Sequence, residues 1–138
     1  MIHLGMRLGP YLVLERIGSG GMGTVYLAQG EEERRIALKV LHPHLVEEPG
    51  FLRRIRAEGT LGRRIRHPNV VTTLDAAQVE LDGTTLFYLA TEYVEGQTLR
   101  GLLAELGRVP EELCLHIGHE VACGLEAIHA AGIVHRDL

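Results

Sequence analysis

The spacing of apolar and polar residues in the first two thirds of the chain predicts short strands separated by tight turns. Apolar residues come in runs of β-branched and aromatic type, bounded by glycine, proline and charged residues. The strands predicted in this way are residues 11–17, 24–29, 34–41, 70–81 and 84–94. The last two meet at Asp82-Gly83, a dipeptide typical of a hairpin turn. The pattern indicates an antiparallel sheet of five strands.

A different spacing, with apolar residues three and four apart, predicts helices. The first helix covers residues 51–65 and is stopped by His67-Pro68. A short helix is expected over residues 97–106, and a longer one begins at Pro110 and ends near Gly132. The apolar stripe of the longer helix is Leu113, Ile117, Val121, Leu125 and Ile128. The predicted fold class is therefore α+β, with one unit at residues 8–94 and a mainly helical one at 95–138.

Composition and charge exclude some classes of function. The 138 residues are 46% hydrophobic, enough for a globular core, and the net charge of −4 gives no general attraction to nucleic acid or anionic lipid. No apolar run approaches the ~18 residues of a membrane span. Cys114 and Cys123 fall on one predicted helix ~13 Å apart, too far for a disulfide. We expect a cytoplasmic protein, while a membrane anchor elsewhere in a longer chain stays open.

Lys39 is the single lysine among fourteen lysine and arginine residues, and it lies inside an apolar strand. Lysine carries a compact charge on a flexible stem, whereas arginine is planar and forked, so the exception indicates a specific task. Ala37 is expected on the same face of the strand, where a small side chain leaves room for a flat ligand. The alternatives are chance retention of one lysine, or a strand-end lysine reaching for water.

The segment from Gly18 to Gly23 matches the pattern G-x-G-x-x-G. Glycines let a backbone turn tightly and bring amide groups close to phosphate oxygens. A dinucleotide site requires a helix directly after such a loop, whereas the segment that follows here reads as a strand. A glycine loop between two antiparallel strands is the arrangement found in kinases. The alternative is a flexible hairpin that binds nothing.

Glu58 falls on the apolar stripe of the first helix, together with Phe51 and Ile55. An inward carboxylate is costly unless it is paired, and Lys39 is the expected partner. Pairing with Arg54, one turn earlier on the same helix, is the alternative.

The chain resembles the Hanks-type protein kinase family, and its glycine loop is especially similar to that of bacterial serine/threonine kinases. The resemblance rests on five motifs in order: the glycine loop, Ala37-x-Lys39, the inward Glu58, His67-Pro68-Asn69 and His135-Arg136-Asp137-Leu138. It covers residues 8–138 and implies transfer of the γ-phosphoryl group of Mg·ATP to a Ser or Thr hydroxyl of a protein substrate.

The resemblance also implies a role for individual residues. Lys39 would bind the α- and β-phosphates, Glu58 would hold Lys39, and Asp137 would be the catalytic base. Thr91 would be the gatekeeper, and the backbone of Glu92 and Val94 would bind the adenine edge. Residues implied around the nucleotide are Ile17, Gly18, Ser19, Gly20, Gly21, Met22, Gly23, Val25, Ala37, Lys39, Thr91, Glu92 and Val94.

The chain also departs from the family pattern. The Asn and the Asp-Phe-Gly motif that bind Mg²⁺ in this family, and a large helical remainder, are not in the sequence. We therefore expect these 138 residues alone to be inactive. The alternative is a non-catalytic nucleotide-binding or decoy module, if the natural chain ends at Leu138. Gly62 occupies a position where a bulkier apolar residue is common, which predicts a looser helix.

Two further clusters have a chemical and a structural interpretation. Six arginines, which would suit nucleic acid or a phosphorylated loop, are more typical of a solvated helix face: Arg53, Arg54, Arg56, Arg63, Arg64 and Arg66. His116, His119 and Cys123 are metal-ligand types, but one straight helix suits tetrahedral geometry poorly, so packing is favoured over a metal site. His42 and His44 lie in a predicted loop with no identified partner.

Overall fold

The computed structural model describes residues 2–134, apart from the side chain of Glu58. It divides into two compact units, each of which is described by itself. The first contains residues 1–64 and 72–93, and the second residues 65–71 and 94–138.

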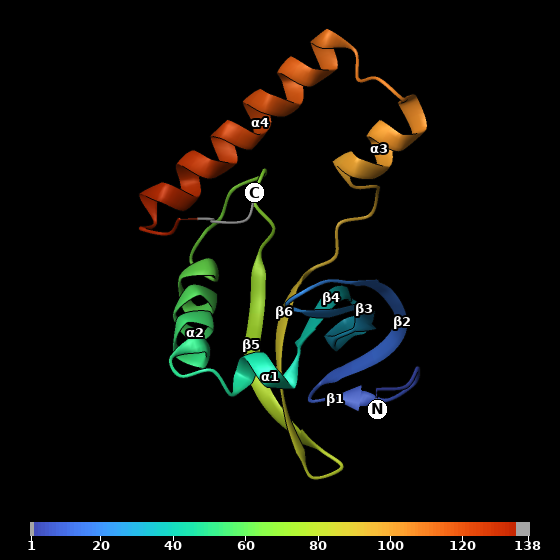
Figure 1. Ribbon diagram of the computed structural model, residues 1–138, viewed down its shortest axis with the longest axis vertical. Helices are drawn as coiled ribbons and strands as arrows, with labels where there is room; N and C mark the ends of the chain where they lie inside the picture. The colour runs from blue at the N-terminus through green and yellow to red at the C-terminus, as the bar shows by residue number, and fades with distance from the viewer. Residues whose placement is uncertain (1, 135–138) are drawn as a thin grey trace. The chain divides into compact units, whose positions relative to one another are not determined.

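The first unit is built on an antiparallel sheet of six strands (Figure 1). The strands are β1 (Arg7–Leu8), β2 (Tyr11–Ser19), β3 (Gly23–Gln29), β4 (Arg35–Leu41), β5 (Thr73–Leu81) and β6 (Thr84–Glu92). Their order in the sheet is β1-β2-β3-β4-β6-β5. The five predicted strands are all present. The additional strand β1 pairs Leu8 with Tyr11, and two residues are too few to produce a visible alternation in sequence.

Short helical segments occur in two connections that were predicted as turn and loop. A 3₁₀ turn, η1 (Glu31–Glu33), joins β3 to β4, and α1 (Pro43–Val46) follows β4. Proline suits the first position of α1 because its missing N–H would have no helical partner there. The β5–β6 hairpin turns at Asp82 and Gly83, both with positive φ, as predicted.

The alternation of β4 divides the sheet into two faces with different roles. Ile36, Leu38 and Val40 are buried at 5% exposure or less and join the main core. Ala37 and Lys39 point to the other face and are half-buried. The hydrophobic core and the candidate site therefore share one strand but lie on opposite faces of it.

Helix α2 (Phe51–Gly62) packs along β5, as Figure 1 shows. Its Phe51 is buried against Leu41 and Phe87, and these two lie on the Lys39 side of the sheet. The helix ends three residues before the predicted Ile65, because the chain must leave the helical conformation before His67-Pro68.

The second unit contains α3 (Leu99–Leu106), α4 (Glu111–Ala130) and the loop of residues 65–71. The side chain of Thr98 caps α3 by accepting from the Gly101 amide at 3.1 Å, so this helix begins two residues later than predicted. Glu111 and Glu112 occupy the first turn of α4, where a negative charge is favourable. Among the described residues, no helix combines the length and the apolar character that crossing a bilayer requires.

Candidate functional site

The register of the sheet lines up the predicted nucleotide residues in two rows on one face. Residues that are paired across an antiparallel sheet have side chains on the same face. One row runs across five strands as Gly18, Val25, Lys39, Leu89 and Ala76. The neighbouring row pairs Leu27, Ala37, Thr91 and Thr73. Lys39, Ala37, Val25 and Thr91, which are distant in the sequence, therefore share one surface.

The glycine loop forms the turn between β2 and β3 and is closed by a hydrogen bond from the Gly20 amide to the Gly23 carbonyl at 2.9 Å. A Cβ added to Gly18, Gly20 or Gly21 would meet no atom within 4 Å. Gly23 differs, because a Cβ there would lie 2.2 Å from the Val40 carbonyl oxygen. Packing thus requires glycine only at Gly23, and the other three leave open space that suits a close approach of phosphate oxygens.

Lys39 is directed toward the tip of this loop. Its Nζ lies 3.9 Å from Sδ of Met22. Met22 and Ile17 each keep more than a third of their surface exposed, so both are accessible to a ligand. An ammonium group beside a glycine turn with open space around it fits the phosphates of a nucleotide.

Helix α2 approaches the Lys39 row through a glycine. A Cβ added to Gly59 would lie 3.0 Å from Cβ of Ala76 and 3.8 Å from Cδ1 of Leu89. Both neighbours belong to the row that contains Lys39. Glu58 immediately precedes Gly59 on the helix, but its side chain is not described, so its pairing with Lys39 or with Arg54 stays a prediction. The Arg54 guanidinium lies 5.9 Å from the centre of the Phe51 ring.

The packing of α2 on β5 explains why glycine occupies position 62, which could not be predicted from the sequence. A Cβ there would lie 2.7 Å from Oγ1 of Thr73 on β5. Gly62 therefore permits a close approach of helix and strand, which differs from the expected loosening of the helix.

Two arginines of the basic cluster, which was expected to be a solvated helix face, contact side chains of β5. Arg56 donates to Oε1 of Gln78 at 2.7 Å, and Arg63 forms an ion pair with Asp75 at 2.9 Å. The other oxygen of Asp75 accepts a hydrogen bond from Tyr88 at 3.3 Å. Burial, followed by the charge of Asp75, raises the pKa of Tyr88 to about 12. The contacts of Arg56 and Arg63 hold α2 on β5, and they could not be predicted from the sequence because they depend on the packing of the helix on the strand.

At the end of β6, both the side chain and the backbone of Glu92 are engaged. Its Oε1 accepts from the Thr72 amide at 2.8 Å, and its own amide donates to the Thr72 carbonyl at 3.0 Å. The Thr91 hydroxyl donates to the Glu92 carbonyl at 3.3 Å. Val94 belongs to the second unit and is 64% exposed. Asp137, the predicted catalytic base, lies outside the described residues.

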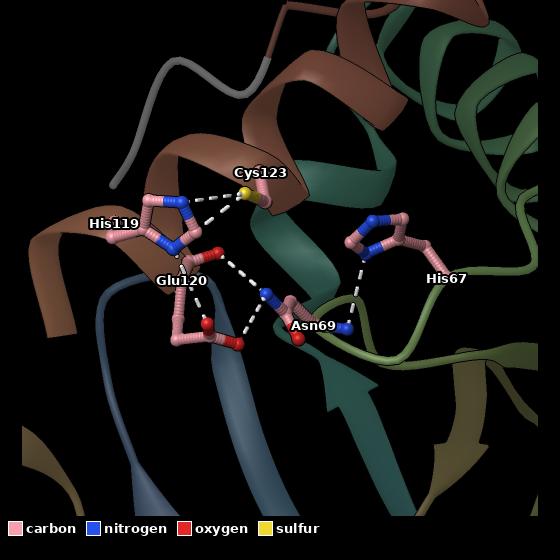
Figure 2. A network of polar contacts seen from close by, with 5 residues as sticks. All are labelled: His67, Asn69, His119, Glu120 and Cys123. Atoms are coloured by element: carbon pink, nitrogen blue, oxygen red, sulfur yellow. Dashed lines mark hydrogen bonds and ion pairs between the residues drawn. The ribbon is translucent and has the colours of Figure 1, made fainter. Parts of the chain in front are cut away.

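Within the second unit, Asn69 ties its loop to α4 (Figure 2). Its amide nitrogen Nδ2 donates to the Glu120 carbonyl at 2.9 Å and to Oε2 of Glu120 at 2.8 Å. A Cβ on Gly124 would lie 2.9 Å from the Asn69 carbonyl oxygen, so the helix also approaches closely here. The hydrogen bond from Asn69, followed by that from His119, holds the pKa of Glu120 below its ordinary value.

His119 and Cys123, which were considered as metal ligands, lie one turn apart on α4. The Cys123 sulfur is 3.8 Å from Nε2 of His119 (Figure 2). Over residues 2–134, no group of three or more histidine, cysteine or acidic side chains is arranged to hold a metal ion.

Comparison with known proteins agrees with this geometry. The sequence model of the protein kinase domain matches residues 11–138. The chain is 40% identical over 134 residues to the serine/threonine-protein kinase drp72 of Corynebacterium efficiens, covering 95% of this chain and 26% of that protein. It is 37% identical over 135 residues to the serine/threonine-protein kinase PksC of Streptomyces coelicolor, covering 94% of this chain and 24% of that protein.

A solved structure agrees as well. The crystal structure of the Mycobacterium tuberculosis PknI kinase domain is 30% identical, with a TM-score of 0.87, and covers all of this chain and 55% of that one. The chain thus spans about a quarter of the length of the two curated relatives. With the ordered motifs and the α+β fold, these matches lead to one conclusion: the chain belongs to the protein kinase family, among relatives that are bacterial serine/threonine kinases.

Proposed function

We propose that the protein is an ATP-dependent serine/threonine protein kinase that transfers the γ-phosphoryl group of Mg·ATP to hydroxyls of a protein substrate. The observation that carries the proposal is the row Gly18, Val25 and Lys39, which sets the single lysine beside an open glycine loop. Phosphoryl transfer depends mainly on positioning and on stabilising charge, and both requirements fit a cation beside oriented backbone amides.

Each residue has a role in this proposal. The loop from Gly18 to Gly23, with Ser19 among its residues, covers the phosphates, and Lys39 neutralises the charge of the α- and β-phosphates. Ile17, Val25 and Ala37 enclose the adenine, whose edge binds the backbone of Glu92 and Val94 behind Thr91. Glu58 holds Lys39, and Asp137 accepts the proton of the attacking hydroxyl.

Magnesium is bound in this family by an Asn and an Asp-Phe-Gly motif, which are not among residues 1–138. When bound, the metal would supply positive charge to offset the negative charge that develops during transfer. We propose that residues 1–138 by themselves bind nucleotide without transferring phosphate, since the family's Asn and Asp-Phe-Gly ligands are not among them.

The test is phosphate incorporation from radiolabelled ATP by the full-length gene product, with mass spectrometry to identify the acceptor. Lys39→Met and Asp137→Asn should each lower the rate by about 10²-fold or more. His3→Ala, a change at an exposed residue that precedes the edge strand β1, should leave the rate unchanged. Transfer that is equally fast in Lys39→Met and Asp137→Asn would refute the assignment of the site. Incorporation into tyrosine alone would refute the serine/threonine specificity.

A further inference from the structure

His42 is the first residue after β4 and makes two contacts with the glycine loop. Its ring atom Nε2 lies 3.0 Å from the Gly20 carbonyl oxygen. Its backbone amide donates to the Met22 carbonyl at 3.1 Å. The second contact is available to any residue except proline, whereas the first depends on the histidine side chain.

The protonation of the ring follows from the partner. A carbonyl oxygen can only accept, so Nε2 must carry the proton, either in the neutral tautomer or in the imidazolium. The ring is oriented by its neighbour His44, which stacks on it with ring centres 5.6 Å apart and planes inclined by 15°. His42 and His44, for which the sequence indicated no partner, thus stack on each other, and His42 contacts the glycine loop.

The loop is also held at Gly23, which packs closely on β4, whereas the rest of it is less constrained. Gly18, Gly20 and Gly21 have open space around them, and its internal backbone bond joins Gly20 to Gly23. Glycine has more conformational freedom to lose than any other residue, so an unanchored loop would lose much entropy on binding phosphate. A side chain that already holds the Gly20 carbonyl lowers this cost before the ligand arrives.

His42 is also close to Lys39 in the sequence, three residues further along the chain and one residue beyond the end of β4. We propose that His42, supported by His44, is a positioning residue for the glycine loop. It holds the Gly20 peptide at a distance from β4 that lets the loop and Lys39 bind the same phosphates. This inference rests on the proposed nucleotide-binding function of the loop.

The test compares two ligands on the full-length gene product by isothermal titration calorimetry. ATP contacts the loop through its phosphates, whereas adenosine has none. In His42→Ala, we expect the dissociation constant of ATP to rise about five- to tenfold, the effect of one lost hydrogen bond, and that of adenosine to stay within about twofold. His42→Gln, which keeps an N–H donor of similar reach, should restore ATP affinity to within about twofold of wild type.

Two controls separate positioning from general damage. His44→Ala removes the stacking partner and should weaken ATP binding by about twofold. His3→Ala, an exposed histidine away from the loop, should change neither affinity. An equal loss of ATP and adenosine affinity in His42→Ala would mean that the histidine only supports the fold, which overturns the inference.

The outcome also distinguishes this inference from the proposed function. Wild-type protein that binds neither ligand would overturn the proposed function together with the role of His42. Wild-type protein that binds ATP, with His42→Ala binding it equally well, would overturn the role of His42 alone.

Discussion

The two units each fix a loop against a regular element, but they do so by different means. In the first unit, the glycine loop rests on β4 because Gly23 has no side chain where the Val40 carbonyl lies. In the second unit, the loop of residues 65–71 is tied to α4 by the side-chain amide of Asn69. The contact at Gly23 depends on the absence of a Cβ, whereas the contact at Asn69 depends on a polar side chain. Disrupting the contact at Gly23 should cause a large loss of stability that does not depend on pH. Disrupting the contact at Asn69 should cause a small loss that depends on the ionisation of Glu120.

Gly23→Ala should give the largest loss of stability. A methyl group 2.2 Å from a backbone oxygen can be accommodated only by moving β3 or β4. We expect a loss of about 3 kcal/mol in the free energy of unfolding, measured by urea denaturation. Gly21→Ala is the matched control, because its Cβ meets no atom within 4 Å and its stability should change by less than about 0.5 kcal/mol. Equal stability of the two variants would show that the close approach at Gly23 is not required.

Gly62→Ala should have an intermediate effect, because two contributions oppose each other. Alanine favours the helix over glycine by about 1 kcal/mol, and overpacking against Thr73 costs about 2 kcal/mol. The expected net loss in the free energy of unfolding is therefore about 1 kcal/mol. In a Thr73→Ala background the clashing Oγ1 is absent and only a Cβ contact at 3.3 Å remains, so the loss should disappear and Gly62→Ala should stabilise the protein by up to about 1 kcal/mol. A Thr73→Val background keeps a branch atom at that place and should keep the loss, so identical effects in the two backgrounds would contradict this explanation.

Asn69→Ala should have the smallest effect on stability, since the hydrogen bonds that it removes are exposed. Its clearer signature is electrostatic, because the pKa of Glu120 should rise toward its ordinary value when the strongest contact that lowers it is lost. A lowered pKa in the folded state stabilises the protein above the pKa of the unfolded carboxyl, and this contribution is lost as pH falls through the lowered value. The variant should therefore lose less stability on acidification than wild type.

The measurement for Asn69→Ala is an NMR titration of the Glu120 carboxyl, together with urea denaturation at neutral and acidic pH. Gln97→Ala is the control, because Gln97 donates to Glu105 and not to Glu120. A pKa of Glu120 that is unchanged in Asn69→Ala would show that this hydrogen bond does not cause the shift.

Patterns that repeat along the chain could be predicted, because local physics determines them. The alternation of apolar and polar residues along β4 predicts that Ala37 and Lys39 share a face, and Asp82-Gly83 predicts the hairpin turn. The α+β fold with its antiparallel sheet followed from these patterns and is confirmed by the likeness to a solved kinase domain.

Contacts between elements could not be predicted, because they depend on register and on the distance between helix and strand. His42 had no partner in sequence because Gly20 is brought to it only when β3 pairs with β4. Helix propensity alone predicts only a looser helix at Gly62, whereas glycine is needed there because Thr73 on β5 lies too close for a side chain. The roles of Glu58 and Asp137 stay predictions.

Strand β4 supplies Ile36, Leu38 and Val40 to the core and Lys39 to the opposite face, and the residue directly after the strand, His42, contacts the glycine loop. Insertion or deletion of a single residue within Arg35–Leu41 would turn part of the strand over, exchanging a charge for a core side chain. Length variation should therefore be rejected along β4 and accepted at the Asp82-Gly83 turn, where the added residues face solvent. In a library of random insertions and deletions selected for nucleotide binding, no tolerated change should fall within β4.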